Sequence, residues 1–419
     1  MKKIGIIGFG MILLGIIFGG CKSRTNYMDE KFQTEKNLIS STLKDIPMLE
    51  NEDIITIQIP ELFEHSEGFV LDHLLDSIWY VPLETNNLSL IEYVEEVILF
   101  QDFLFILDKF GKRVLKFDSN GKFIKQIGSN GRGPGEYTTP HSFQIINEMV
   151  LVHDDRTSKI MYYDLNGNFI KDERLGLRIN RCTSYGKDKF ICDIAARDNF
   201  HRKEISDYKL IFTESDWVIT GKADYYDAES KKFANSRATV TKFKDKLIYN
   251  PSFDYFIYSV NIDGMQKKYY IDVGKRKMPE DAIKNLSINE FVKKYSSRES
   301  DYMHIDSPVF ETDKILYTEL RYKAQNYPLF YSKESGTLIC SKYYSNSMNY
   351  ALGLPTRITH IYGDTFAGYI EAHQIVRSMD SWRENPDLLA EIPDNIRKFS
   401  DEINEDDNPV LVFFTLKNF

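Results

Sequence analysis

Short runs in which apolar and polar residues alternate follow one another along most of the chain, with turn residues between them. Alternation with a period of two is typical of β-strands that bury one face. The first such runs are 54–59 and 77–83. Three more follow closely at Phe103–Asp108, Arg113–Asp118 and 122–127. The pattern therefore predicts an all-β protein.

The same arrangement returns further along the chain. Strands are expected at Met149–Asp154, Lys159–Asp164 and 168–172, and one constant offset of 46 residues, as from Asp108 to Asp154, superimposes them on the previous three. The matched positions are Asp108 with Asp154, Asp118 with Asp164, Gly121 with Gly167, and Phe123, Ile124 and Lys125 with Phe169, Ile170 and Lys171. Each unit has an Asn-Gly pair, which suits a two-residue hairpin turn with positive φ angles. A period of this size, with several strands per unit, is typical of β-propeller blades.

Later units match less closely. Their strands are expected at 189–193 and 208–220, at 246–249, 256–262 and 265–272, at 314–319, 329–333 and 337–343, and at 365–372 and Val410–Leu416. Helical insertions are expected at 287–300, where Ser287 and Glu290 have capping-box spacing, and at 386–403, and some helix is expected near 38–43. Without the insertions, the chain accommodates about six units. The sequence thus predicts a six-bladed β-propeller with small helical insertions at 54–419, closed by an early strand beside Val410–Leu416.

Several strings carry a family resemblance. They are YVPLET at 80–85, FILD at 105–108, FDSNGKFIKQIG at 117–128 and GRGPGEY at 131–137. In these strings the chain resembles the six-bladed β-propeller lipoproteins common in Bacteroidetes, which are distant relatives of the NHL-repeat propellers. The close resemblance covers about 77–171. It implies a fold and an envelope location but no assigned chemistry.

The N-terminus carries a targeting pattern. Two lysines precede an apolar stretch at 4–18, which has the length of a signal peptide and is short for a membrane span. Two glycines and Cys21 follow, and the arrangement resembles a bacterial lipoprotein signal. The resemblance implies a signal peptide at 1–20, cleavage before Cys21, a lipid on its thiol and a polar tether at 21–53. An uncleaved anchor with an incidental cysteine is the alternative.

Composition narrows the classes of function. The net charge is −9, and Lys and Arg are scattered along the chain, which argues against a nucleic-acid partner. Cys182 and Cys192 flank an expected hairpin turn, so a disulfide between them fits an oxidising compartment. Buried free thiols are the interpretation that we favour for both. Because metal-ligand spacing is absent, neither a metal nor a cofactor is expected.

A glycine-rich loop at 128–137 follows the third strand of the first unit. It lacks the GK[ST] ending of a phosphate-binding loop, and no helix is expected after it. A blade-to-blade crossover that needs glycine conformations is therefore the favoured interpretation. Such crossovers lie on the face where propellers usually bind ligands. Arg132, Glu136 and Tyr137 project from this loop and are the candidate contact residues.

Other candidate chemistry is weaker. His153 lies beside Asp154 and Asp155, a combination that could serve a metal or acid–base role. Because Asp154 repeats Asp108, the favoured role of Asp154 is a structural bond at the end of a strand. Three aromatic residues could stack on sugar rings, but packing inside or between blades is favoured for them: Trp217, Tyr225 and Tyr226. The sequence contains neither a GxSxG nor an HExxH motif. No catalytic residue is therefore assigned.

Two functions remain. The favoured one is a lipid-anchored lipoprotein of the cell envelope, expected in the outer membrane, whose propeller is a binding or scaffold module for a protein or glycan. The alternative is a propeller-type enzyme, a glycan lyase or hydrolase, with its site at the central channel. A pocket with convergent His, Tyr or Arg and a shifted pKa would favour the enzyme, and a sealed or apolar channel would favour binding.

Overall fold

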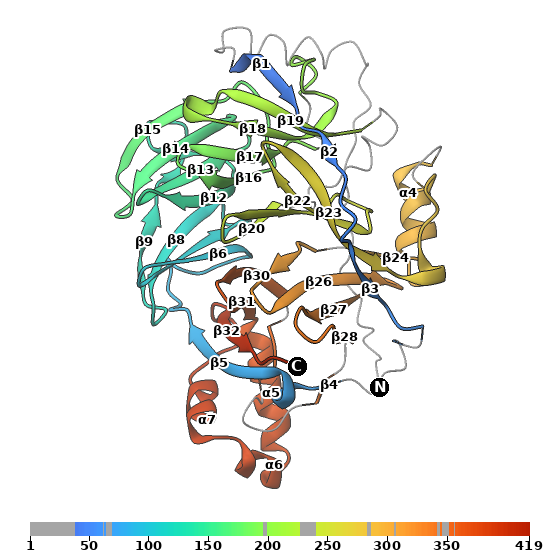
Figure 1. The fold of residues 1–419 in the computed structure, drawn as a ribbon. Coiled ribbons are helices and arrows are strands. Elements are labelled where there is room, and N and C mark those ends of the chain that lie inside the picture. The colour runs from blue at the N-terminus through green and yellow to red at the C-terminus, as the bar shows by residue number, and fades with distance from the viewer. Residues whose placement is uncertain are drawn as a thin grey trace.

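The computed structural model describes residues 38–61, 63, 69–195, 199–226, 240–282, 286–305, 307–341, 344–345, 352–355 and 357–419. Six sheets form the blades of a ring, which confirms the predicted all-β, six-bladed propeller (Figure 1). Strands are lettered A to D from the central channel outward. Cys21 and the signal region at 1–20 lie outside the described residues.

Blades 1 and 2 are the two units with the constant offset. Blade 1 consists of β6 (Val94–Phe100), β7 (Phe103–Asp108), β8 (Arg113–Asp118) and β9 (Phe123–Ile127), and blade 2 of β12 (Pro140–Ile146), β13 (Met149–Asp154), β14 (Lys159–Asp164) and β15 (Phe169–Arg174). Strands B to D confirm the predicted strands. Strand A of each blade, β6 or β12, was not expected.

The repeated glycine has two physical reasons. Gly121 and Gly167 have φ angles of 82° and 77°, whereas Asn120 and Asn166 do not have positive φ. The expected two-residue turn is therefore wrong, and each hairpin is a longer turn that ends on a left-handed glycine. In addition, a Cβ atom on Gly121 would lie 1.9 Å from the carbonyl oxygen of Pro82 in the neighbouring blade 6. The Glu84 N–H also donates to the Gly121 carbonyl at 2.8 Å. This turn therefore joins one blade to the next.

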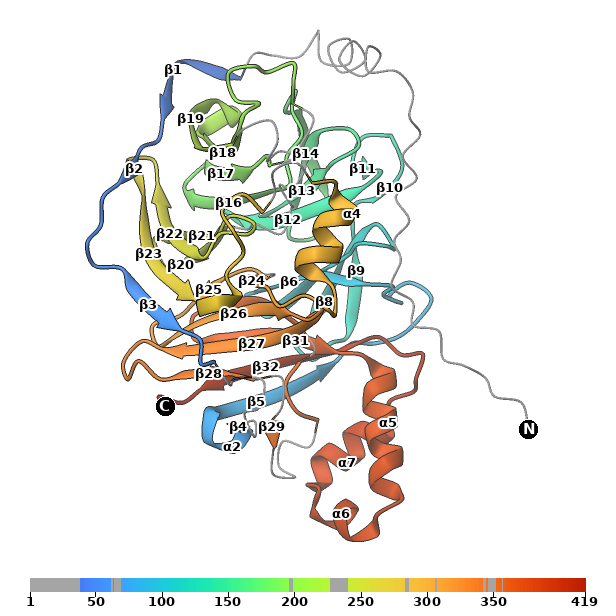
Figure 2. The same cartoon turned by 90° about the vertical axis from the view of Figure 1, so that its right-hand side faces the viewer.

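Blades 3 and 4 carry extra strands from the N-terminal segment. Blade 3 consists of β16 (Arg181–Gly186), β17 (Lys189–Asp193), β18 (Tyr208–Thr213) and β19 (Ile219–Tyr225), and blade 4 of β20 (Val240–Phe243), β21 (Lys246–Tyr249), β22 (Phe256–Asn261) and β23 (Gly264–Asp272). The added strands are β1 (Ile39–Asp45), parallel to β19, and β2 (Met48–Leu49) and β3 (Ile55–Gln58), parallel to β23. Figure 2 shows this strap along the outside of the ring.

The strap corrects two expectations. The helix expected near 38–43 is wrong, because β1 pairs its backbone with β19 instead. Strands also begin at Ile39, so part of the segment interpreted as a tether contributes to the sheets of blades 3 and 4. An unpaired outer strand exposes backbone N–H and C=O groups, and the strap satisfies those of two blades.

A disulfide joins Cys182 and Cys192. The two cysteines stand opposite each other on β16 and β17, with their Cα atoms 4.0 Å apart. The favoured interpretation of two buried free thiols is therefore wrong, because the hairpin register brings the two side chains together on one face. Cys340 is buried and free.

Blades 5 and 6 complete the ring. Blade 5 consists of β24 (Met303–Ile305) and β25 (Phe310–Glu311), which both pair with β26 (Ile315–Tyr322), followed by β27 (Gln325–Ser332) and β28 (Leu338–Cys340). Blade 6 consists of β30 (Arg357–Tyr362), β31 (Thr365–Ile370), β32 (Val410–Leu416) and β5 (Leu75–Pro82). The predicted closure by an early strand is confirmed, and the strand is β5. Before it lie α2 (Leu71–Leu74) and β4 (Phe69–Val70), which pairs with β29 (Tyr344–Ser345).

The two ends of the channel differ in their connections. At the turn end, strands A and B are joined by two or three residues, at 101–102, 147–148, 187–188, 244–245, 312–314 and 363–364. The crossover end carries the blade-to-blade crossovers and the connections between strands B and C. The crossover from blade 4 to blade 5 holds η3 (Gly274–Arg276), α4 (Ile288–Phe291) and η4 (Val292–Ser296). The B–C connection of blade 6 holds α5 (Ala372–Arg383), α6 (Pro386–Glu391) and α7 (Asp394–Asp401).

The helices confirm one prediction and extend another. Ser287 and Glu290 form the predicted capping box at the start of α4. The predicted insertion at 386–403 contains α6 and α7, but α5 was not expected. Figure 2 shows α4 and α5–α7 on the same side of the ring. The core lies between neighbouring blades, as where Phe105 of blade 1 packs in one cluster with Phe143 and Tyr163 of blade 2.

Candidate functional site

Two repeated aspartates fix the backbone at the crossover end. Asp108 ends strand B of blade 1, is fully buried and accepts hydrogen bonds from the backbone N–H groups of three residues, Glu92, Tyr93 and Gly111. Its second oxygen pairs with Arg113 Nε at 3.2 Å. Asp154 in blade 2 likewise accepts from the N–H groups of three residues, Thr138, Thr139 and Arg156. The predicted strand-end role of Asp154 is therefore confirmed.

The glycine-rich loop forms the crossover from blade 1 to blade 2. It contains the short parallel pair β10 (Ser129–Asn130) and β11 (Glu136–Tyr137). The Glu136 carboxylate accepts the Gly133 N–H at 2.8 Å, so the loop supplies its own acceptor for this backbone donor. The favoured interpretation of the loop as a structural crossover agrees with this geometry.

The three candidate contact residues of this loop have different surroundings. Arg132 is exposed, and Glu136 is half-buried and holds the loop closed. Tyr137 is fully buried, donates its hydroxyl to the Ile127 carbonyl at 2.6 Å and accepts the Val114 N–H at 3.1 Å. Burial raises the pKa of Tyr137 to about 12. Tyr137 therefore does not project from the surface as expected, because its ring packs between two blades.

An exposed apolar cluster lies at the crossover from blade 6 to blade 1. It consists of Leu88, Leu90 and Phe110, here called the Phe110 cluster, with exposed fractions of 69, 46 and 60 %. The Arg113 guanidinium donates to the backbone carbonyls of Leu88 and Leu90, and Asp108 holds the adjoining turn. The three apolar side chains are thus presented to solvent on a braced backbone.

Tyr93 links the Phe110 cluster to polar groups that border the channel. Its ring lies 5.0 Å from that of Phe110, and its hydroxyl accepts a hydrogen bond from Arg357 Nη1 at 2.8 Å. Nearby, Glu95 pairs with Lys109 at 3.0 Å. Burial raises the pKa of Glu95, but the charges of Lys109 and then Arg357 outweigh burial and leave the pKa below its ordinary value.

Three titratable side chains converge from strands A of three blades. Arg181 Nη2 of blade 3 lies 3.4 Å from Oε2 of the buried Glu96 in blade 1. Burial raises the pKa of Glu96, and the charge of Arg181 opposes this shift. Burial, reinforced by the charge of Arg181, lowers the pKa of His360 in blade 6 to about 4. At neutral pH the imidazole of His360 is therefore neutral, beside the contact between Arg181 and Glu96.

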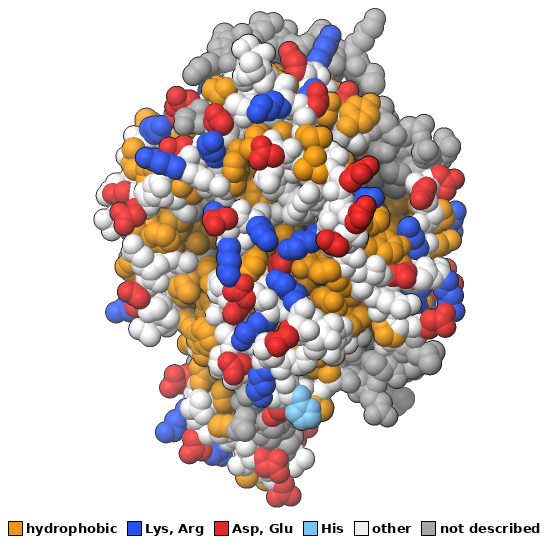
Figure 3. Space-filling view, in the orientation of Figure 1, with side chains coloured by type: hydrophobic (Ala, Val, Ile, Leu, Met, Phe, Trp, Pro, Cys, Tyr) orange, Lys and Arg blue, Asp and Glu red, His pale blue; other side chains and the backbone are white. Residues whose placement is uncertain are grey.

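A small hollow lies at the turn end. Its volume is about 130 Å³, and its charged lining residues are Lys242, Lys244, Asp313 and Asp364. Lys244 Nζ lies 2.5 Å from Asp313 Oδ1, so charges here are paired. In the view of Figure 3, Lys and Arg side chains likewise alternate with Asp and Glu over the whole face.

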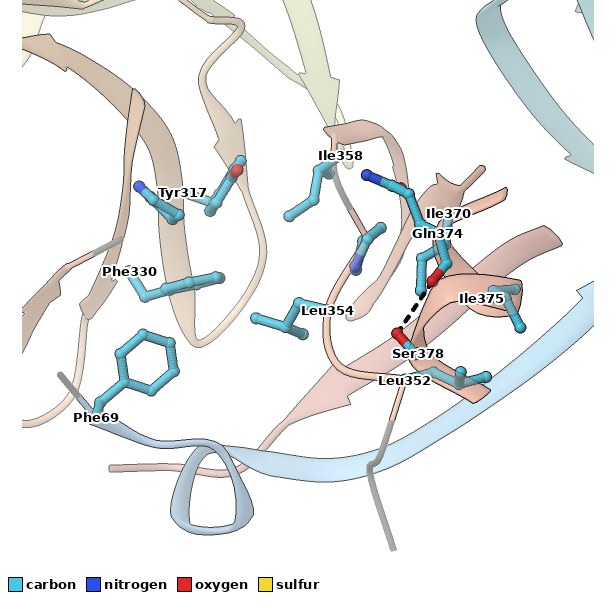
Figure 4. A pocket seen from close by; sticks show the side chains of 12 residues that line it. Phe69, Tyr317, Phe330, Leu352, Leu354, Ile358, Ile370, Gln374, Ile375 and Ser378 are labelled. Carbon is cyan, nitrogen blue, oxygen red and sulfur yellow. Dashed lines mark hydrogen bonds between the residues drawn. The ribbon is translucent and has the colours of Figure 1, made fainter. Parts of the chain in front are cut away.

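A larger cavity lies between blades 5 and 6. Its volume is about 340 Å³ (Figure 4). Tyr317 and Phe330 of blade 5 face Ile358 of blade 6, and Ile375 and neighbouring residues of α5 close another side. Sequence patterns gave no signal for this site, because its walls come from two blades, a helix and the crossover at 352–355.

The remaining candidate residues have structural surroundings. Trp217 stacks on Phe190 at 4.4 Å and donates to the Tyr162 hydroxyl, and Tyr226 is buried, whereas Tyr225 is exposed. Packing inside or between blades is therefore confirmed for Trp217 and Tyr226. Within the described ranges, no group of three or more His, Cys, Asp or Glu side chains is placed to hold a metal ion. The described helices also include none long and apolar enough to cross a membrane.

Comparisons with known proteins agree with this fold. A presumed exported protein from Bacteroides fragilis is 20 % identical, with a TM-score of 0.70 over 87 % of this chain and 99 % of that chain. A DUF4221-family protein from Bacteroides vulgatus is 9 % identical, with a TM-score of 0.45 over 82 % of this chain and 97 % of that chain. At 20 % identity, the similarity to the Bacteroides fragilis protein shows the fold alone. None of the curated proteins matches the sequence. Residues 54–415 match the family described as Domain of unknown function (DUF4934), and the chain therefore belongs to this family.

Proposed function

We propose that this protein is a lipid-anchored binding module of the cell envelope, which engages a protein partner through the Phe110 cluster at its crossover end. The observation that carries the proposal is the exposure of two leucines and a phenylalanine on a backbone braced by Asp108 and Arg113. Exposed apolar groups are the usual anchors of protein interfaces, and a rigid backbone lowers the entropy cost of binding. Because leucines offer little to a sugar ring, a protein is favoured over a glycan.

The envelope location rests on two supports. The first is the resemblance of residues 1–21 to a lipoprotein signal. The second is the Cys182–Cys192 disulfide, because disulfides persist in oxidising compartments. The change Cys21→Ala is expected to release the protein from membranes, as measured by fractionation. If the variant stays membrane-bound with its signal uncleaved, the lipid anchor is wrong.

Binding at the Phe110 cluster is tested by affinity capture from detergent-solubilised envelope. Wild-type protein is expected to recover a specific partner that Phe110→Ser loses by at least about tenfold. Tyr225→Ser is the matched control, because Tyr225 is a similarly exposed aromatic residue, on strand D of blade 3. Equal recovery by wild type and Phe110→Ser would reject this surface. Binding only on a glycan panel would replace the protein partner with a glycan.

A glycan lyase or hydrolase is the second candidate, because Arg181, Glu96 and His360 converge from three blades. With a pKa of about 4, His360 is neutral at neutral pH and its imidazole can accept a proton. Wild-type protein would then release oligosaccharides from a polysaccharide panel, and His360→Ala would abolish the release. Absence of products with the wild type removes this candidate.

A further inference from the structure

Most of the described residues that line the cavity between blades 5 and 6 are apolar. Phe330, Ile358 and Ile375 are buried, and Phe69 and Leu354 extend the walls (Figure 4). Its volume of about 340 Å³ lies within the range of small-molecule sites. A ligand that removes such walls from water gains roughly 25 cal/mol for each Å² of apolar surface buried.

Among the residues that the structure describes, those that line this cavity include no charged side chain. A carboxylate or an ammonium group placed inside would lose its hydration without gaining a counter-ion. The cavity therefore selects against charged ligands. In this respect it differs from the site of Arg181 and Glu96 and from the hollow at the turn end, which both contain charged side chains.

The polar side chains in the lining are those of Gln374 and Ser378 on α5, together with the Tyr317 hydroxyl. The Tyr317 hydroxyl donates to Glu319 Oε1 at 2.8 Å. The Ser378 hydroxyl donates its proton to the Gln374 carbonyl at 3.0 Å, as drawn in Figure 4. The Ser378 oxygen can then only accept, so a ligand that bonds to it must supply the proton.

We propose that this cavity binds an uncharged small molecule with an aromatic or aliphatic body and a single hydrogen-bond donor, such as a hydroxyl or an N–H group. The body lies against Phe330, Ile358 and Leu354, and the donor meets Ser378. This site is separate from the Phe110 cluster, so its occupancy does not depend on the proposed protein partner.

The test uses N-phenyl-1-naphthylamine, an uncharged fluorescent probe with one N–H donor. Full-length protein in detergent is titrated with the probe, and saturable one-site binding is expected. Displacement by 1-octanol is expected at concentrations at least about tenfold lower than by octanoate, because the carboxylate is charged and cannot donate. No saturable binding, or equal displacement by the two competitors, would overturn the proposal.

Variants locate the probe. Leu354→Trp fills the cavity and is expected to weaken binding at least about tenfold. The control Ile170→Trp adds the same bulky side chain at a residue that is 49 % exposed on strand D of blade 2, and it leaves binding unchanged. Ser378→Ala keeps the space but removes the acceptor, and is expected to weaken binding about fivefold. Ser378→Leu fills the cavity from α5, and thermal unfolding of each variant checks folding. Unchanged binding by folded Leu354→Trp and folded Ser378→Leu would place the probe elsewhere and reject the site, leaving insertion of a partner's apolar side chain as the account of the cavity.

Discussion

The turn end and the crossover end of the channel belong to the same six blades but differ in the length of the connections between strands. At the turn end, every A–B connection has two or three residues, and the hollow found there has paired charges. At the crossover end, the connections carry the described helices α4 to α7, the glycine-rich loop and the Phe110 cluster. Short turns leave one end fixed by hairpin geometry, whereas long connections allow side chains to be added without disturbing the sheets. The difference places candidate binding surfaces at the crossover end.

The first prediction, which has the largest expected effect, compares Asp108 at the crossover end with Asp118 at a hairpin turn. Asp108→Ala removes the acceptor of three buried or half-buried backbone N–H groups and the partner of Arg113, and is expected to cost about 4 kcal/mol of unfolding free energy. Asp118→Ala at an exposed hairpin turn is expected to cost about 1 kcal/mol. Urea unfolding measures both. Equal losses of unfolding free energy would show that the Asp108 hydrogen bonds stabilise the crossover end no more than Asp118 stabilises an ordinary turn.

The second prediction compares two glycines with positive φ. Gly121→Ala is expected to cost about 3 kcal/mol, because the new Cβ meets the Pro82 carbonyl of the neighbouring blade in addition to the unfavourable φ. Gly363→Ala at the turn end is expected to cost about 1 kcal/mol, since nothing lies within 4 Å of its Cβ position. Thermal unfolding of the pair measures the contribution of blade-to-blade contact. A similar loss in both variants would mean that the backbone angle alone requires the glycine.

The third prediction concerns pH. The folded pKa of His360, about 4, lies below the ordinary value of 6.5, so the unfolded chain binds the proton more strongly. The stability that depends on neutral His360 is fully present above about pH 6.5 and falls as the pH drops towards 4, by about 3 kcal/mol. His360→Gln should lose this part of the pH dependence in chemical unfolding, whereas His373→Gln, on α5, should retain it. An unchanged profile in His360→Gln would contradict the assignment.

The smallest expected effect concerns the Phe110 cluster. Phe110→Ser is expected to change the unfolding free energy by less than about 0.5 kcal/mol, because the side chain is mostly exposed. Together with a loss of partner capture, an unchanged urea midpoint would separate binding from folding at the crossover end. A loss of more than about 2 kcal/mol would instead make Phe110 a structural residue.

Much of the framework was predictable from the sequence, and the exceptions share a cause. Strands B to D of blades 1 and 2 were predicted correctly. Strands B and C are short apolar runs, because both of their faces pack between blades, and strand D follows a recognisable hairpin turn. Strands A were missed in these blades. They carry polar residues such as Glu95, Glu96 and His141 towards the channel, and bulges at Val94/Glu96 and Pro140/Ser142 interrupt the period of two. The charged group around Arg181 was missed for the same reason.

The candidate contact residues show the same limit. Arg132 is exposed as expected, but Tyr137 is buried, because its aromatic ring fills the space between two blades, which single-blade patterns do not reveal. The 340 Å³ cavity needs residues from β4 to α5, separated by some 300 positions, from Phe69 to Ser378. No local pattern predicts such a site.

By itself, the sequence determined the number and kind of blades, because hairpin turns and alternating strands are local and repeat with a fixed period. It also contains the signal pattern that predicts a lipid anchor. Only the tertiary structure decided that β5 closes the ring, that the N-terminal strap covers blades 3 and 4, and that Cys182 bonds to Cys192. The physical reason is that strand pairing between distant segments depends on which sheet edges and apolar faces remain open once the blades have formed.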